Sequence, residues 1–342
     1  MNQPEHNTGG AEPDRVIGNP NPVFGLLVAP LLSFAMYIAV FLIPVLGFAI
    51  NMLAPLPMIY YFFTHGRQPM YFALILSALA SAIVLGTLME DSGFGLRMGL
   101  FYLLSHGLVA VLISEMILRR DDMEKTVFTA TFIPMIVTGL VFIAISPVSL
   151  GELYVSLLEK TRLMLGETVV AYQNAGIPPE QTQMLSQNIE ETSMWIVKLI
   201  PTTSVIGYLL LAMLNYYGYK RIQKRFPFLP STVRSTLSKW YPPDKTVYVF
   251  IAGALAVFFF NGILGSIGVN VVLILISLYS LAGMAVVQFF LEKYNVVLFL
   301  RLLAYSIIIV QPFFLSMVAG LGLFDLWFDF RKIRNNVENH GV

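Results

Sequence analysis

A histidine within an apolar segment is the first residue in this chain that could do chemistry. His106 lies near the middle of the apolar stretch 98–118. Ionisable side chains are costly to place in hydrocarbon, so each needs a partner or a function. Because imidazole titrates near neutral pH and is readily buried neutral, two interpretations stand. His106 is either a proton-linked or ligand-contacting group, or a neutral ring bonded to a neighbouring helix.

Three further ionisable residues lie in the long apolar region 296–330: Arg301, Asp325 and Asp329. If this region forms two antiparallel helices, Arg301 and Asp325 lie roughly 8–9 Å below the same membrane surface, at 1.5 Å rise per residue. We therefore expect an ion pair between them. Asp329, one turn further out, would share Arg301 or pair with Lys332. Such a pair is either a structural contact between two short helices or a gate or ligand clamp.

Polar residues near the ends of other apolar segments have simpler interpretations. Glu115 lies one helical turn before Arg119, a spacing that predicts a local ion pair at the membrane edge. Lys198 lies near the outer end of segment 195–219, where its long side chain can extend to the aqueous interface. Pro201, about one turn further in, is expected to kink this helix or delay its start.

Several classes of chemistry are excluded by what the sequence lacks. The chain has no cysteine, which excludes disulfides, thiolate metal sites and cysteine nucleophiles. No metal-ligand spacing, nucleophile elbow or P-loop occurs, so we predict no catalytic residue, no metal, no cofactor and no ATPase activity of its own. The formal net charge is +1 and no basic stripe occurs, so nucleic acid is not an expected partner.

The composition predicts an integral membrane protein. Hydrophobic residues make up 57% of the 342 residues and charged residues only 12%, whereas a soluble domain carries about 25% charged residues. The mean hydropathy is +0.74. A single soluble core stops growing near roughly 250–300 residues, so this much apolar surface is expected to face lipid. The predicted fold class is all-α: a polytopic transmembrane helix bundle whose main partner is the bilayer.

Apolar stretches of about 20 residues mark the spans and predict about ten of them, together with a helical hairpin outside the cytoplasm. The predicted segments are a disordered cytoplasmic tail (1–21), transmembrane helices one to five (24–147), the extracytoplasmic helical hairpin (150–193), the sixth transmembrane helix (195–219), a basic cytoplasmic interfacial loop (220–245), transmembrane helices seven to ten (247–330) and a cytoplasmic tail (331–342).

Prolines and glycines set the finer boundaries of this map. Region 296–330 is too long for one comfortable span, and Pro312 in its middle predicts a division into two helices. A turn is expected near Ser266, where Gly262, Gly265 and Gly268 would form a loose connection. Gly99, like the neighbouring Gly95, is of the small type that permits close approach between membrane helices.

The distribution of charge predicts the orientation, because cytoplasmic loops collect lysine and arginine. Loop 220–245 is strongly basic and is placed in the cytoplasm, whereas 150–193 is rich in glutamate and falls outside. Counting spans in both directions from this loop places the N-terminus and the basic C-terminal tail in the cytoplasm. Ten spans satisfy this arrangement, and nine would place the basic tail outside.

The C-terminal sequence resembles a known family. The run LGLFDLWFDFRK at 321–332, and LSKWYPP at 237–243 before a long apolar stretch, resemble the YybS-like family of bacterial multi-pass membrane proteins of unknown function. This resemblance implies location in the bacterial cytoplasmic (inner) membrane. More distantly, such proteins look like the substrate-binding subunits of energy-coupling-factor vitamin transporters. That likeness implies a partner membrane protein or ATPase that would supply energy.

Three functions are therefore open. The first is a membrane transport component that holds a small solute between helices. The second is a non-transporting scaffold that assembles an envelope complex, and the third is a membrane-embedded enzyme acting on lipid-linked substrates. A solute-binding bundle should contain a cavity with convergent polar groups, a scaffold should present an exposed patch, and an enzyme should place an acid–base pair at an interface.

Overall fold

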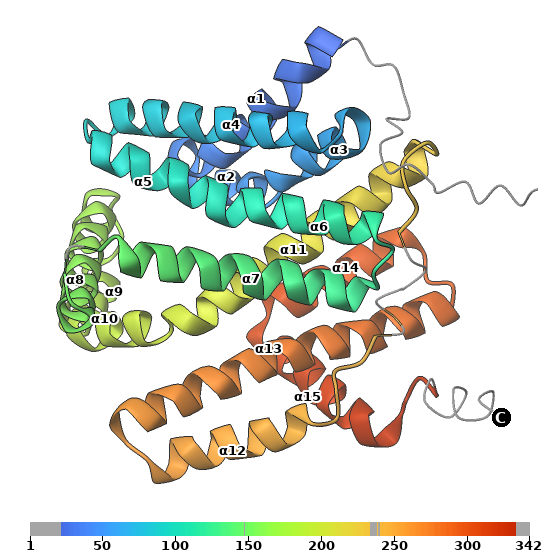
Figure 1. Ribbon diagram of the computed structural model, residues 1–342. Helices are drawn as coiled ribbons and strands as arrows, with labels where there is room; N and C mark the ends of the chain where they lie inside the picture. The colour runs from blue at the N-terminus through green and yellow to red at the C-terminus, as the bar shows by residue number, and fades with distance from the viewer. Residues whose placement is uncertain (1–21, 147, 233–237, 239, 333–342) are drawn as a thin grey trace, which may run out of the picture. The chain divides into compact units, whose positions relative to one another are not determined.

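A computed structural model describes residues 22–146, 148–232, 238 and 240–332 (Figure 1). Every regular element among these residues is a helix, so the predicted all-α class is confirmed. The predicted tail 1–21 and most of the predicted tail 331–342 lie outside the described residues.

Fewer helices meet the length and composition of a membrane span than the ten spans that the sequence predicts. Among the described residues, five helical segments are long and apolar enough to cross a membrane, or seven if each of two bent pairs is one span. Two shorter apolar helices, Leu27–Leu42 and Thr246–Phe259, are below this length. The protein is therefore a multi-pass membrane protein, whereas the predicted count of ten is not confirmed.

The chain divides into two compact units, and the first comprises Met1–Leu140 and Tyr208–Val233. Its helices are α1 (Pro22–Leu42), α2 (Pro44–Asn51), α3 (Pro55–His65), α4 (Arg67–Leu88), α5 (Ser92–Tyr102), the π-helical turn η1 (Leu103–Gly107), α6 (Leu108–Leu118), most of α7 (Met123–Ala144) and the C-terminal part of α11 (Ile200–Arg225).

Prolines and capping residues determine where these helices begin. Pro44 and Pro55 occupy the first positions of α2 and α3, where the missing N–H costs nothing and the fixed φ suits a helix. Gly66, with φ 92°, separates α3 from α4. Asp91 caps α5 by accepting the N–H of Phe94 at 3.0 Å, the usual role of aspartate at a helix start.

Glycines bring α4 and α5 into close contact, as the sequence predicts. A Cβ atom built on Gly99 would lie 2.6 Å from the carbonyl oxygen of Ala78, and one on Gly95 would also collide with the backbone of α4. No larger residue fits at this spacing. The two helices therefore pack with their backbones nearly touching, as small residues allow in membranes.

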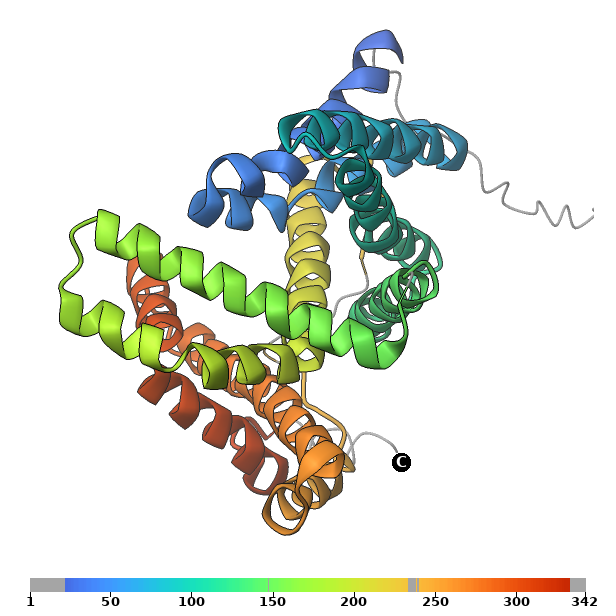
Figure 2. The same cartoon turned by 90° about the vertical axis from the view of Figure 1, so that its left-hand side faces the viewer.

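The second unit comprises Val141–Gly207 and Arg234–Val342. Its helices are α8 (Leu150–Asn174), α9 (Pro179–Gln187), α10 (Ile189–Lys198), the first turns of α11, α12 (Thr246–Phe259), α13 (Gly262–Lys293), α14 (Leu298–Val310) and α15 (Pro312–Phe328). Figure 2 shows α8 lying alongside α9 and α10. Ser149 and Glu152 form a capping box at the start of α8, which accounts for its boundary.

The turn expected near Ser266 is wrong. The chain turns at Phe260 and Asn261, and α13 begins at Gly262. Gly268 lies within α13 and faces α12: a Cβ there would lie 2.9 Å from the carbonyl oxygen of Gly253. Gly253 and Gly268 permit close packing of α12 and α13, whereas Gly262, with φ 66°, directly follows the turn.

The division of region 296–330 at Pro312 occurs as predicted. Pro312 is the first residue of α15, and the axes of α14 and α15 differ by 101°. The two pieces form either a broken span or a re-entrant structure, because α14 has only 13 residues. A full span needs about 20 residues.

Candidate functional site

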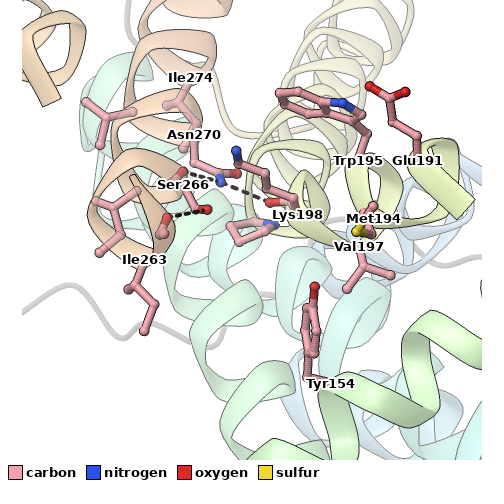
Figure 3. Close-up of a pocket in the computed structure, with 14 residues that line it drawn as sticks. Tyr154, Glu191, Met194, Trp195, Val197, Lys198, Ile263, Ser266, Asn270 and Ile274 are labelled. Carbon is pink, nitrogen blue, oxygen red and sulfur yellow. Dashed lines mark hydrogen bonds between the residues drawn. The ribbon is translucent and has the colours of Figure 1, made fainter. Parts of the chain in front are cut away.

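A cavity of about 1020 Å³ lies within the second unit (Figure 3). This volume is at the upper end of the roughly 300–1,000 Å³ that is typical of small-molecule sites. The lining residues come from α8, α10, the start of α11 and α13: Tyr154, Glu191, Met194, Trp195, Val197, Lys198, Pro201, Gly262, Ile263, Ser266, Ile267, Asn270, Val271 and Ile274. Most of the wall is apolar, and a few polar groups interrupt it.

One wall of the cavity contains the break between α10 and α11. Pro201 has no backbone N–H, and a proline ring clashes with the carbonyl four residues before it in a regular helix. The axes of α10 and α11 differ by 55°. In an unbroken helix the N–H of Thr202 would donate to the carbonyl of Lys198. The break therefore leaves one donor and one acceptor without their usual helical partners.

Asn270 of α13 satisfies both of these backbone groups. The N–H of Thr202 donates to Asn270 Oδ1 at 3.1 Å, and Asn270 Nδ2 donates to the carbonyl of Lys198 at 2.9 Å. The Thr202 hydroxyl donates to the same Oδ1 at 2.7 Å. A single buried amide thus replaces one turn of helical hydrogen bonding and fixes the bend against α13.

Two opposite charges lie on one face of α10 at the cavity. Glu191 and Lys198 are seven residues apart, which is two helical turns and about 10 Å along the axis. The Lys198 ammonium lies 4.5 Å from the centre of the Trp195 ring, a cation–π contact. Among the described residues, no carboxylate lies within 4.0 Å of this ammonium. Lys198 is therefore able to meet an anionic group in the cavity.

The lining of this cavity combines few titratable groups with a largely apolar wall. No cluster of three metal-ligating residues occurs among the described parts of the chain. The titratable side chains that line the cavity are Tyr154, Glu191 and Lys198, and no hydrogen bond links them as an acid–base pair. Charge, aromatic rings and an apolar wall suit recognition of an amphipathic molecule.

Of the residues that the sequence singles out, Lys198 and Pro201 line this cavity, and the candidate ionisable residues of the apolar segments lie elsewhere. His106 is in η1 of the first unit and is buried. Its Nδ1 lies 2.8 Å from Ser105 Oγ and its Nε2 lies 3.1 Å from Asn51 Oδ1. Because Asn51 Nδ2 donates to the carbonyl of Tyr37, its Oδ1 faces the imidazole and Nε2 must carry a hydrogen. Both ring nitrogens have partners, and a proton-linked role for His106 stays a prediction.

The expected ion pair between Arg301 and Asp325 is wrong. Asp325 pairs with Arg331, whose Nη2 and Nε lie 2.6 and 3.0 Å from Asp325 Oδ2. Arg331 Nη1 also donates to the carbonyls of Ser238 and Trp240, at 2.9 and 2.8 Å. Arg301 instead donates from Nε to the carbonyl of Val296 at 2.6 Å.

The reason for this difference is the end of α15. Asp329 takes a left-handed conformation with φ 40°, and its carbonyl accepts the N–H of Lys332 at 2.8 Å. This turn brings Arg331 back onto Asp325 and over the segment that contains Ser238 and Trp240. The pair is local in sequence and buried, with side-chain exposures of 1% and 5%.

The expected pair between Glu115 and Arg119 is also wrong. Glu115 of α6 accepts from Arg67 of α4 through both carboxylate oxygens, at 2.7 and 2.9 Å. Two parallel bonds to a guanidinium are geometrically better than one contact along a helix. This pair joins two helices of the first unit, whereas the cavity belongs to the second.

Sequence reasoning missed Asn270 and the position of Glu191 and Lys198 on one wall of the cavity. The useful signal is Pro201, which breaks an apolar helix three residues after Lys198. Nothing in the sequence pattern identifies Asn270, because it lies 68 residues from Thr202.

The apolar helices and the cavity define the class: a multi-pass helical membrane protein with a site of ligand size. Residues 31–326 match the family described as predicted membrane protein DUF2232, and the chain belongs to this family. The match is consistent with the resemblance to the YybS-like family. No curated protein and no solved structure matches the chain.

Proposed function

We propose that this protein is a membrane transport component that binds a small solute in the cavity beside the α10–α11 break. The supporting observation is the cavity itself, in which the charged side chains of Lys198 and Glu191 line a largely apolar wall. Discontinuous helices form the substrate sites of many membrane transporters, because a break directs helix ends and polar groups at the ligand. No P-loop occurs in the sequence, so energy would come from a partner or an ion gradient.

A pair of variants tests this proposal. Ser266 lines the cavity and donates to the carbonyl of Gly262 at 2.9 Å, so Ser266→Phe is expected to fill the opening. Ser316 of α15 makes the same contact with Pro312 at 2.9 Å and does not line the cavity, which makes Ser316→Phe the matched control. Native mass spectrometry of the gently purified protein should find a stoichiometric small molecule, lost in Ser266→Phe and retained in Ser316→Phe.

Other results would contradict transport. A stoichiometric co-purifying protein with no small molecule would favour the scaffold. A small molecule retained equally in both variants would lie outside this cavity.

The proposed setting is the bacterial cytoplasmic membrane, with both termini in the cytoplasm and residues 150–193 outside. The support is the charge distribution: acidic residues over 150–193 and basic residues over 220–245. Because the chain has no cysteine, single substitutions give a clean test. In intact cells, a membrane-impermeant maleimide should label Glu167→Cys and should not label Thr232→Cys until the cells are lysed. The reverse pattern would invert the topology.

A further inference from the structure

The shape of the cavity restricts its ligand more than its volume does. Ile263, Ile267, Val271 and Ile274 lie on one face of α13 and form an apolar stripe about 16 Å long at 1.5 Å per residue. The charged groups, Glu191 and Lys198, lie on α10 (Figure 3). A small polar solute would leave most of this stripe uncovered. A molecule with a long apolar chain and a compact polar group would cover both parts.

The same end of α13 faces away from the protein. Ile263, which lines the cavity, is 80% exposed, and Phe258 at the adjoining turn is 85% exposed. Neighbouring Phe259 and Leu264 are also exposed. In a membrane protein such a cluster is covered by acyl chains. The apolar side of the cavity therefore adjoins lipid, and a chain can enter it sideways.

The polar side of the cavity is complementary to a headgroup with two opposite charges. Lys198 offers a cation with no carboxylate partner among the described residues, and Glu191 offers an exposed carboxylate on the same face of α10. An anion alone would meet Glu191 unfavourably, and a cation alone would meet Lys198 unfavourably. Trp195 and Tyr154 add two aromatic rings that are 44% and 49% exposed, the residue types that favour the headgroup level of a bilayer.

We infer that the ligand of this cavity is a lipid with a zwitterionic phosphate–amine headgroup. Its phosphate contacts Lys198, its ammonium contacts Glu191, and an acyl chain lies along the stripe of α13. This inference rests on the proposed function, since it names the ligand class for the same cavity. Phosphatidylethanolamine carries this headgroup, whereas phosphatidylglycerol lacks the ammonium and phosphatidylcholine lacks its N–H donors.

Tryptophan fluorescence provides the test. The chain has three tryptophans, and substituting Trp240→Phe and Trp327→Phe leaves Trp195 at the cavity as the reporter. The full-length protein is reconstituted in nanodiscs that contain phosphatidylethanolamine, phosphatidylglycerol or phosphatidylcholine with brominated chains. Brominated phosphatidylethanolamine is expected to quench the fluorescence of Trp195 most strongly, and to do so at a lower mole fraction in the nanodisc than the other two lipids.

Charge variants assign each half of the headgroup. Glu191→Gln should abolish the preference for phosphatidylethanolamine over phosphatidylglycerol. Lys198→Gln should weaken binding of all three phospholipids about fivefold, the effect of one lysine near a membrane surface. The control is Lys293→Gln, since Lys293 also lies over aromatic rings, at 5.9 Å, but on the other end of α13. It should change neither preference.

Three outcomes separate this inference from the proposed function. Equal lipid preferences in the parent, Glu191→Gln and Lys198→Gln proteins would mean ordinary boundary lipid and would overturn the inference. If soluble glycerophosphoethanolamine binds as tightly as the lipid, the acyl chain contributes nothing to affinity. The lipid inference then fails, while the proposed binding of a small solute stands. If no lipid shows preference and native mass spectrometry finds no small molecule, the proposed function fails as well.

Discussion

Replacing Arg331 with leucine is expected to be among the most damaging substitutions in the second unit. The change removes both bonds to Asp325 Oδ2 and both bonds to the carbonyls of Ser238 and Trp240. The Asp325 carboxylate keeps the backbone N–H of Phe330 at 2.9 Å as a donor. An unpaired carboxylate then remains in a site where its side chain is 5% exposed.

The size of the effect follows from that burial. Removing one partner of a buried ion pair costs about 3–5 kcal/mol, because the remaining charge is desolvated without compensation. The double variant Asp325→Leu/Arg331→Leu should lose less than Arg331→Leu alone, since it removes the stranded charge. It does not recover fully, because the two carbonyls stay without their donor.

The assay is equilibrium unfolding of the purified protein in mixed micelles with increasing mole fraction of SDS. Lys125→Gln is the control for a surface pair, because Lys125 is 67% exposed beside Asp121 and such pairs contribute about 0.2–1 kcal/mol. Arg301→Leu tests the alternative partner for Asp325. A loss of stability below about 1 kcal/mol for Arg331→Leu, or an equal loss for Arg301→Leu, would refute this account.

Three other substitutions have defined outcomes. Asn270→Leu should destabilise the protein by about 2–4 kcal/mol, since it strands two backbone groups at the break; protection of the Thr202 amide from hydrogen exchange should fall with it, and unchanged protection would contradict the bridge. Gly99→Leu should abolish folding of the first unit, seen as loss of monodisperse protein in detergent, whereas Gly139→Leu, with open space around its Cβ position, should fold. Two Ser149 groups donate hydrogen bonds to the Glu152 carboxylate and lower its pKa, so the cap is complete above the ordinary glutamate pKa and is lost as pH falls through the lowered folded value. Exchange of the first amides of α8 should accelerate in that acidic range, and Glu152→Gln, which does not titrate, should remove the pH dependence.

Composition and proline positions predict the class of this fold because they act locally. An apolar stretch of about 20 residues is stable in lipid whatever its neighbours are, and a proline breaks a helix by its own geometry. Pro312 therefore marks the division between α14 and α15 correctly. Gly99 was a correct indication of close packing, because only a small residue allows helix backbones to meet.

The choice of ion-pair partner depends on the folded path of the backbone, and here the sequence reasoning was wrong. The predicted pair of Arg301 and Asp325 assumed two straight helices and matched the depth of the two residues below the same membrane surface. The left-handed residue Asp329 reverses the chain instead and brings Arg331 to Asp325. Glu115 likewise does not pair with Arg119, one turn away. It pairs with Arg67, 48 residues distant, which donates two hydrogen bonds to its carboxylate. Helical periodicity predicts neither of these two ion pairs.

Helix breaks explain three of the buried polar side chains among the described residues, Ser33, Asn215 and Asn270. In the first unit, the α2–α3 break at Pro55 leaves the carbonyl of Met52 without its helical partner, and Asn215 donates to it at 2.8 Å. Ser33 donates to the carbonyl of Ala54 at 2.6 Å in the same turn.

Asn270 serves the α10–α11 break in the same way. Because backbone groups in a lipid environment must be bonded internally, these side chains are accounted for by the backbone alone. The side chains of Lys198 and Glu191 bond to no backbone group at a helix break, yet they share one face of α10 beside a cavity. A buried amide next to a proline break therefore indicates structure, and the charges that remain after this accounting indicate the binding site.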